Sequence, residues 1–354
     1  MSPEQLLEIP ENLQLMARQF ELELLEDLGE RIRLLDGELS ATADWAYIKL
    51  REMNRSKAYI AKRLTEYTQM SIEEIETTLN SSLTETVKND IVLFDKAGVT
   101  PIYTVNNDAF YRVLDTAKNI ATADFTNMSN TLYIDQMYNK ALDMAHIRLS
   151  AGKPITEVVK QAAAEVRRNG IHVVNYDSGT RVNVETAVRR NVMGALNRAT
   201  DQMSLDNAEK LNTNMFEVSA HFNARPDHAL WQGKVYTMQQ LIDICGYGTG
   251  AGLEGWNCRH QKFPFIEGLS GRAWTDEELK HLHTPDITYN GKTYTGYEAT
   301  QYQRQIESRI RELTRANAVM QDAAVVKLIR QNKALYRDFS NKAGLPLQME
   351  RFVA

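Results

Sequence analysis

The sequence predicts a mainly α-helical protein with a small α+β module, and two observations support this fold class. Over roughly the first two thirds of the 354 residues, apolar side chains recur three and four positions apart, as on one face of a helix. Glycine and short alternating segments become frequent only after about residue 214, where we expect strands and turns. We divide the chain into four predicted regions: 1–105, 106–213, 214–295 and 296–354.

Residues 1–105 are predicted to form an N-terminal helical array. Two short helices are expected over 45–53 and 57–67. Ser71, with Glu74 three residues later, has the spacing of a capping box and predicts the start of another helix. The first helix of the array is predicted by a stripe of apolar residues at helical spacing: Leu13, Met16, Phe20, Leu24, Leu28 and Ile32.

The central region, 106–213, is also predicted to be helical. A short apolar segment, His172–Val174, precedes the turn-forming residues Asn175–Gly179 and predicts a strand followed by a turn. The last helix of this region is predicted to bury a face of small and branched residues: Val184, Val188, Val192, Ala195 and Leu196.

Residues 214–295 are predicted to form a loop-rich α+β module. Met215–Ala220 alternates like a strand and is expected to pair with Lys234–Tyr236. Asn290-Gly291 is the residue pair favoured in a type I′ turn, and it predicts a hairpin over 287–295.

Residues 296–354 are predicted to form one long C-terminal helix, reaching about Asn332, and a tail. Ile306, Ile310 and Leu313 mark the apolar stripe of this helix. Its length predicts packing against another long helix or a partner subunit.

Composition indicates a soluble globular protein, since 43% of the residues are hydrophobic and 25% are charged. No apolar run approaches the roughly 20 residues that span a bilayer. The N-terminal residues lack the basic start and apolar core of a signal peptide. We therefore expect synthesis in the cytoplasm and no membrane partner. Two cysteines are too few for a disulfide framework.

Charge is distributed unevenly along the chain. Residues 1–40 carry three basic and ten acidic side chains, whereas residues 301–354 carry ten basic and five acidic ones. This asymmetry suits a protein that docks in one orientation within an assembly, and it equally suits two solvated helical faces of opposite sign.

The residues between His221 and His260 form the one unusual cluster of the sequence. His221, His228, Cys258 and His260 offer the imidazole and thiolate ligands that zinc prefers. Their spacing is not that of a standard zinc finger, because no Cys-x-x-Cys pair is present. The interpretation we favour is structural: the histidines hydrogen-bond loop carbonyl groups, tryptophans pack beneath them, and no cofactor is needed. Zinc is the alternative.

The same segment permits two further interpretations. In the first, Cys258 acts as a nucleophile with His228 or His260 as its base, oriented by Asp227, and Arg259 lowers the pKa of the thiol. Gly250–Gly255 matches the letters of a dinucleotide-binding motif, but a predicted helix precedes it where the motif requires a strand. We expect these glycines to permit tight turns with positive φ.

Several motifs of this chain resemble the phage minor capsid protein 2 family. The principal ones are His221-x3-Arg225-Pro-x-His228-x2-Trp231-Gln232-Gly233 and Gly255-Trp256-Asn257-Cys258-Arg259-His260. Ser56–Ile60, Thr186–Arg190 and Gln303–Arg311 agree with the same family. The family resembles in arrangement the phage Mu-type head-morphogenesis proteins, which often end in Asn-Cys-Arg-Cys, so that His260 here stands in place of the last cysteine.

The resemblance implies a minor structural protein of a phage head, present in few copies in the head interior or at the portal vertex. Such a protein would act in head assembly or genome delivery. The implied partners are the portal protein and the major capsid or scaffold protein, with packaged DNA as a further candidate through basic helices. No catalytic residues come with the resemblance. The residues expected to hold the module's long loop in one shape are Arg225, Trp231, Gly233, Trp256, Asn257 and Arg259. The competing function is a metal-dependent hydrolase or nuclease that uses the four candidate zinc ligands.

Overall fold

The computed structural model describes residues 11–38, 45–130, 134–166, 173–175, 181–255 and 258–352. Within these ranges the chain is mainly helical, with three small antiparallel sheets. The fold class predicted from the sequence is therefore confirmed. Among the described helices, none has a stretch that is both long and apolar enough to cross a membrane.

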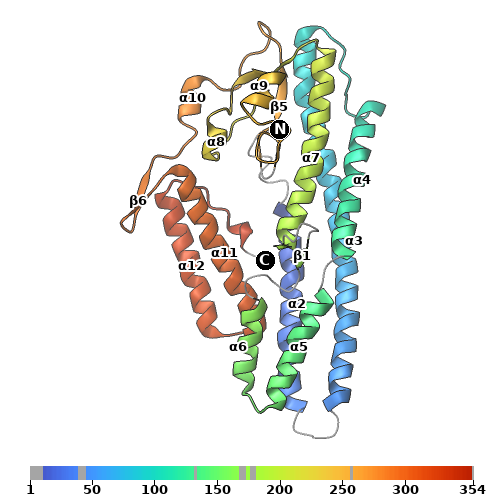
Figure 1. The fold of residues 1–354 in the computed structure, drawn as a ribbon, viewed down its shortest axis with the longest axis vertical. Coiled ribbons are helices and arrows are strands. Elements are labelled where there is room, and N and C mark those ends of the chain that lie inside the picture. The colour runs from blue at the N-terminus through green and yellow to red at the C-terminus, as the bar shows by residue number, and fades with distance from the viewer. Residues whose placement is uncertain are drawn as a thin grey trace.

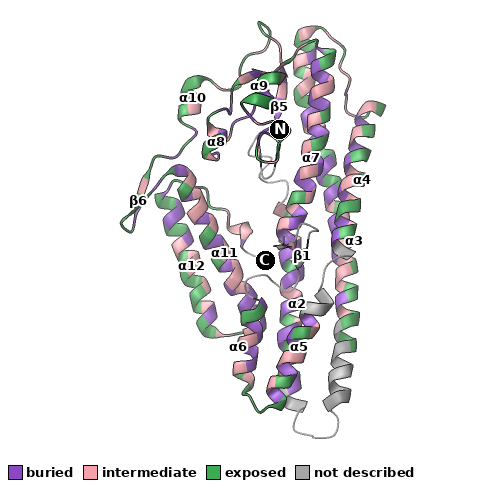
Figure 2. Cartoon of the chain, in the orientation of Figure 1, coloured by how far each residue is buried: buried purple, intermediate pink, exposed green. Residues whose placement is uncertain are grey.

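The first two thirds of the chain form an elongated bundle whose helices run along the long axis of the molecule (Figure 1). Its helices are α2 (Glu11–Glu38), α3 (Trp45–Ala97), α4 (Asp108–Asn130), α5 (Ile134–Ser150), α6 (Ile155–Val166) and α7 (Val184–Lys210). Figure 2 shows buried residues following the inner side of these helices. The stripe predicted for α2 is confirmed, because all of its members except the half-buried Met16 are buried. The face predicted for α7 is buried as well.

Helix α3 corrects the prediction of two short helices and a third one capped by Ser71. It is a single helix of 53 residues, and Ser71 lies buried inside it. The apolar stripe continues on both sides of this serine, through Ile60 and Tyr67 before it and Ile75 and Leu79 after it. Tertiary packing along this stripe therefore overrides the local capping signal.

Two short strands precede α7. They are β1 (Val173–Asn175) and β2 (Arg181–Asn183), which pair antiparallel. The strand predicted at 172–174 is thus present one residue later, whereas β2 was not predicted. Helix α7 begins directly after β2, where the Asn183 side chain accepts a hydrogen bond from the backbone N–H of Thr186.

The α+β module contains a three-stranded sheet in the order β4-β3-β5. The predicted pairing of β3 (Met215–Val218) with β4 (Val235–Thr237) is confirmed. The third strand, β5 (Lys262–Phe265), was not predicted, because Pro264 argues against a strand and the buried positions are Lys262 and Pro264 rather than the two phenylalanines. Three short helices complete the module: α8 (Pro226–Ala229), α9 (Met238–Asp243) and α10 (Asp276–Lys280).

The predicted hairpin is also confirmed, as β6 (Ile287–Tyr289) and β7 (Lys292–Tyr294). Asn290 and Gly291 form its turn with φ of 50° and 80°, as a type I′ turn requires.

The predicted single C-terminal helix is instead a pair of helices. Helix α11 (Gly296–Met320) ends where Gln321 adopts a left-handed φ of 52°. Helix α12 (Ala323–Lys342) begins after Asp322, whose side chain accepts a hydrogen bond from the backbone N–H of Ala324. The chain therefore folds back, and α12 packs along α11 (Figure 1). The long helix expected to pack against residues 296–320 is thus the next helix of the same chain. A short 3-10 turn, Met349–Arg351, follows α12.

The uneven charge of the two ends is partly neutralised within the fold. Acidic α2 lies against α11, and two ion pairs join acidic residues of α2 to basic residues near the C-terminal end: Arg315 with Glu21 and Arg351 with Glu11. Part of the opposite charge of the two ends is therefore paired inside the fold. The boundaries proposed for the four regions stay a prediction.

Helices α2 and α11 approach each other most closely at Gly29. A Cβ atom added there would lie 2.5 Å from the carbonyl oxygen of Val319, which is backbone and cannot rotate away. Gly194 in α7 is a matched control, because its added Cβ would meet only the Arg198 guanidinium at 3.6 Å.

We expect Gly29→Ala to lower the free energy of unfolding by about 1–3 kcal/mol, because α11 must shift. Gly194→Ala should raise it by roughly 0.5–1 kcal/mol, because alanine favours a helix over glycine. Urea unfolding followed by circular dichroism measures both. Equal effects of the two substitutions would show that the close approach has no energetic role.

Candidate functional site

The β3–β5 pairing brings together the two halves of the His221–His260 cluster. Val218 pairs with Lys262, and beyond this pair the backbone N–H of Ser219 donates to the carbonyl of Gln261 at 2.9 Å. His221 lies two residues after Ser219, and His260 lies directly before Gln261. The side chains of the two histidines therefore lie next to each other. Helix α8, which carries His228, packs over the same end of the sheet.

Close packing makes glycine necessary at the turns around the site. A Cβ atom at Gly233 would lie 2.3 Å from Leu279 Cδ2, and φ there is +67°. The positive φ predicted for the glycines of 250–255 is wrong, because Gly250, Gly252 and Gly255 have none. A Cβ at Gly252 would instead lie 2.1 Å from the carbonyl oxygen of Gly246, and one at Gly255 would lie 2.5 Å from that of Gly250. The loop folds tightly on itself, and the described residues that follow it lead into β5, whereas the dinucleotide-binding motif requires a helix there.

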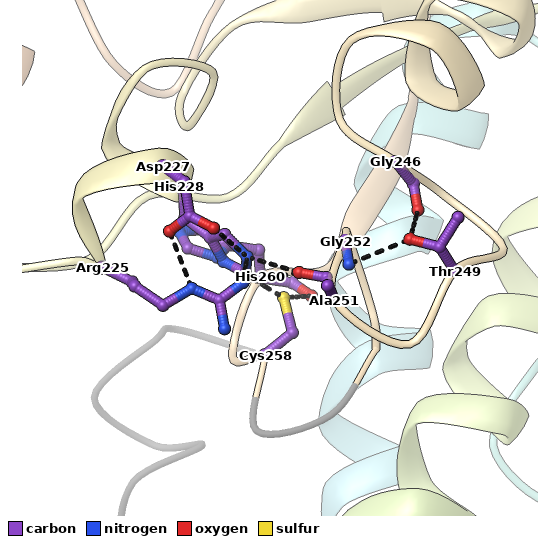
Figure 3. Close-up of polar contacts among 9 residues, drawn as sticks. All are labelled: Arg225, Asp227, His228, Gly246, Thr249, Ala251, Gly252, Cys258 and His260. Carbon is purple, nitrogen blue, oxygen red and sulfur yellow. Dashed lines mark hydrogen bonds and ion pairs between the residues drawn. The ribbon is translucent and has the colours of Figure 1, made fainter.

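Three of the four predicted zinc ligands point toward one another (Figure 3). His228 Nδ1 lies 3.4 Å from His260 Nδ1. Cys258 Sγ lies 3.8 Å from His228 Nδ1 and 3.6 Å from His260 Nδ1. His228 is 4% exposed, Cys258 5% and His260 1%, so their donor atoms lie close together out of contact with bulk water.

His221 does not belong to this group of three. Its ring stacks on that of His260, with centroids 4.4 Å apart and planes 26° apart, and its Nδ1 lies 3.2 Å from the carbonyl oxygen of Phe222. The structure thus brings together three of the four side chains that the sequence singled out and places His221 beside them as a stacking partner.

The side chains expected to support the histidines occupy the predicted places where they are described. The Trp231 ring lies against His228, with centroids 4.5 Å apart, and meets His260 edge-on. Arg225 forms an ion pair with Asp227 at 2.7 Å, as expected for an arginine paired with a carboxylate. Arg225 Nη2 also contacts His228 Nε2 and the carbonyl oxygen of Ala251. Trp256 and Asn257 lie outside the described residues.

Burial opposes charge on each member of the group. It raises the pKa of the Cys258 thiol to about 11 and lowers the pKa values of His228 and His260. Burial outweighs the charge of the nearby arginine Arg225, so the free thiol is protonated at neutral pH, and this gives no support to Cys258 as a nucleophile.

We expect both cysteines to resist alkylation in the folded protein. Burial also raises the pKa of Cys245, to about 12, and both thiols are buried. Iodoacetamide at pH 8 should modify each at least roughly tenfold more slowly than in urea, because only an exposed thiolate reacts. Mass spectrometry of the two peptides measures the rates. Rapid modification of folded Cys258 would revive the nucleophile hypothesis.

Arg259 lies in a group of like charges. Its pKa lies well below the usual value because of burial first, and then because of Arg304 from α11, Arg189 from α7 and Arg351. Each of these four side chains is half-buried. The group joins a motif residue to two helices of the larger fold, and the ion pairs of Arg351 with Glu11 and Glu307 offset part of its positive charge.

A buried ionic group beside the cluster was missed by sequence analysis. The Lys262 side chain is 0% exposed, its Nζ lies 3.1 Å from Glu254 Oε2, and it contacts Asp201 as well. The same Nζ lies 4.3 Å from the centre of the Tyr247 ring, whose hydroxyl donates to Asp201. Burial lowers the pKa of Lys262 and raises that of Glu254. No sequence pattern marks a lysine as buried, so only the paired strand reveals it.

Comparison with known proteins gives two similarities. The family model for phage minor capsid protein 2 matches residues 1–342. A protein of Lactococcus phage mv4, named structural protein, is 36% identical over 67 residues, which are 19% of this chain and 46% of that protein. The match thus spans less than half the length of this relative. No solved structure matches the chain.

Proposed function

Since the chain belongs to the phage minor capsid protein 2 family, it is a phage structural protein, and we propose that it acts at the portal vertex or in the head interior. The observation that carries the proposal is the extent of the family match, which covers 342 of 354 residues and so includes the bundle, the α+β module and both α11 and α12. The name of the Lactococcus phage relative, structural protein, supports a role in the particle rather than in metabolism.

The proposed partners are the portal protein and the major capsid or scaffold protein. Exposed large apolar side chains of the α+β module support contacts with other proteins, since such side chains are often buried at interfaces. Four of them occur close together in the sequence: Phe222, Leu230, Ile242 and Ile244. Leu230 is the most exposed, at 73%. The arginine group around Arg259 supports an acidic partner, and packaged DNA is the second candidate for it.

The experiment is an amber mutation in the gene, with particles examined by mass spectrometry and electron microscopy. The protein should be present in wild-type heads in few copies and absent from the mutant. Mutant cells that make no filled heads would identify a role in assembly, whereas filled heads that adsorb without delivering DNA would identify a role in genome delivery. Absence of the protein from both wild-type particles and portal complexes would overturn the proposal.

The proposed protein contacts are tested by Leu230→Asp. This variant should fold normally and lose association with portal or capsid complexes, because a charge would replace a contacting apolar group. Leu328→Asp is the matched control, since Leu328 is also an exposed leucine but lies on α12. Unchanged association of Leu230→Asp would remove this residue from the interface.

A further inference from the structure

We propose that His228 Nδ1, Cys258 Sγ and His260 Nδ1 bind one Zn²⁺ ion, which fastens the glycine-rich loop to α8 and to the start of β5. The proposal goes beyond the structural role above and does not depend on it. It is carried by the mutual distances of the three donor atoms, by the hydrogen bonds of the two imidazole rings, and by the burial of the group.

The three distances match those between ligands of a tetrahedral zinc ion. With Zn–N and Zn–S bonds of about 2.05 and 2.3 Å, two nitrogen ligands lie about 3.3 Å apart and nitrogen and sulfur about 3.6 Å apart. The measured values are 3.4 Å between the two Nδ1 atoms, and 3.6 and 3.8 Å from Sγ to each of them. A cation can therefore bind at the common centre without rearrangement of the backbone.

Hydrogen bonding leaves the Nδ1 atom of His260 free to bind a metal. Its Nε2 lies 3.1 Å from Gln232 Oε1, and the backbone N–H of His221 donates to that same oxygen at 3.0 Å. The oxygen of the Gln232 amide therefore faces both groups, and His260 Nε2 must carry a hydrogen. The neutral ring then presents its lone pair at Nδ1, toward Cys258 and His228.

The surroundings of His228 allow the same orientation without imposing it, because the Arg225 guanidinium, which can only donate, contacts the same ring nitrogen that faces the Ala251 carbonyl. His228 Nε2 lies 3.1 Å from the carbonyl oxygen of Ala251, which can accept its hydrogen and leaves the lone pair at Nδ1. Arg225 Nη2 contacts the same Nε2 and also Ala251. Metal binding requires that both the arginine and the histidine donate to this carbonyl, which has two lone pairs for them. Two buried imidazole lone pairs facing each other repel, and a cation between them removes the repulsion.

The ligand types select zinc among common divalent ions. Two imidazoles and one thiolate are nitrogen and sulfur donors, whereas Mg²⁺ and Ca²⁺ prefer oxygen. Binding replaces the proton of the Cys258 thiol by the metal, and the proton leaves to solvent. Three protein ligands leave one tetrahedral position for a water molecule or a group from a partner.

The test is the metal content of full-length protein, measured by inductively coupled plasma mass spectrometry after expression with zinc and desalting. Wild-type protein should hold about one zinc ion per chain. Cys258→Ser and His260→Ala should lose it. Cys245→Ser is the matched cysteine control, since Cys245 is equally buried in the same apolar cluster but outside the group, and it should keep the zinc. His221→Ala, whose ring stacks on His260, is the matched histidine control and should keep it as well.

Cobalt binding keeps the proposal testable if a ligand variant fails to fold. Wild-type protein stripped of metal and titrated with Co²⁺ should show thiolate-to-cobalt charge-transfer absorption and the visible bands of tetrahedral cobalt. Gln232→Ala should weaken zinc binding by roughly 10–100-fold, because it orients a ligand without touching the ion. The proposal is overturned if wild-type protein binds neither zinc nor cobalt, or if the Cys245 and His221 variants lose zinc as fully as the ligand variants do.

Discussion

Replacing Arg315 by alanine is expected to lower the free energy of unfolding by about 3–5 kcal/mol. Arg315 Nε lies 2.8 Å from Glu21 Oε2, and the two side chains are only 6% and 5% exposed. The variant removes the Arg315 cation from the buried Glu21 carboxylate, and the cost of that desolvated charge is the source of the effect. Denaturant unfolding followed by circular dichroism measures it.

Arg309→Ala is the matched control for this substitution. Arg309 lies on the same helix and also forms an ion pair, with Glu312 at 3.2 Å, but its side chain is solvated. The control should change stability by at most about 0.5 kcal/mol. A double variant, Arg315→Met with Glu21→Leu, should recover most of the lost stability, because neither charge of this pair is then left buried. If Arg315→Ala costs as little as the control, the pair does not hold α11 to α2.

The second large effect is expected for Lys262→Met. The lysine is enclosed by the Glu254 and Asp201 carboxylates and by the Tyr247 ring. Methionine would preserve the packing made by the aliphatic part of the lysine side chain. It would leave the buried Glu254 carboxylate without the lysine cation. We expect a loss of about 3 kcal/mol, the lower end of the range for breaking a buried pair, because Asp201 retains contact with water.

Thermal unfolding of Lys262→Met and of Lys280→Met compares a buried ion pair with an exposed one. Lys280 pairs with Glu277 at 2.8 Å where both side chains are solvated, so its loss should have little effect. Adding Glu254→Gln to Lys262→Met should restore part of the stability, because it removes the unpaired charge. Failure of this rescue would show that the lysine contributes through packing instead.

Periodicity predicted those helices whose core contacts lie on one regular stripe. The faces of α2 and α7 follow from the spacing of their apolar residues and are confirmed. The continuity of α3 does not follow, because Ser71 gives a local start signal that only tertiary packing overrides. The break between α11 and α12 has no glycine or proline to announce it. Asp322 as an N-cap residue was the available signal.

The sequence indicated which residues lie near one another at the candidate site, but it did not indicate how their side chains are arranged. Histidine and cysteine are rare in this chain, so their gathering was visible in the sequence. Which of them converge depends on β3 pairing with β5 across more than 40 residues, and this places His221 as a stacking partner rather than a ligand. The buried Lys262 depends on the same pairing. Contacts fixed by strand register cannot be derived from spacing along the chain.

The uninterrupted helix α3 sets the length of the helical bundle. A helix of 53 residues rises about 80 Å, and α3 extends along most of the bundle in Figure 1. It contacts α2, α4, α5 and α7 along its course. A rigid rod braced in this way resists bending, so a force applied at one end is delivered to the other as a displacement of the whole rod. In a particle, such a strut would set a fixed distance between whatever contacts its two ends.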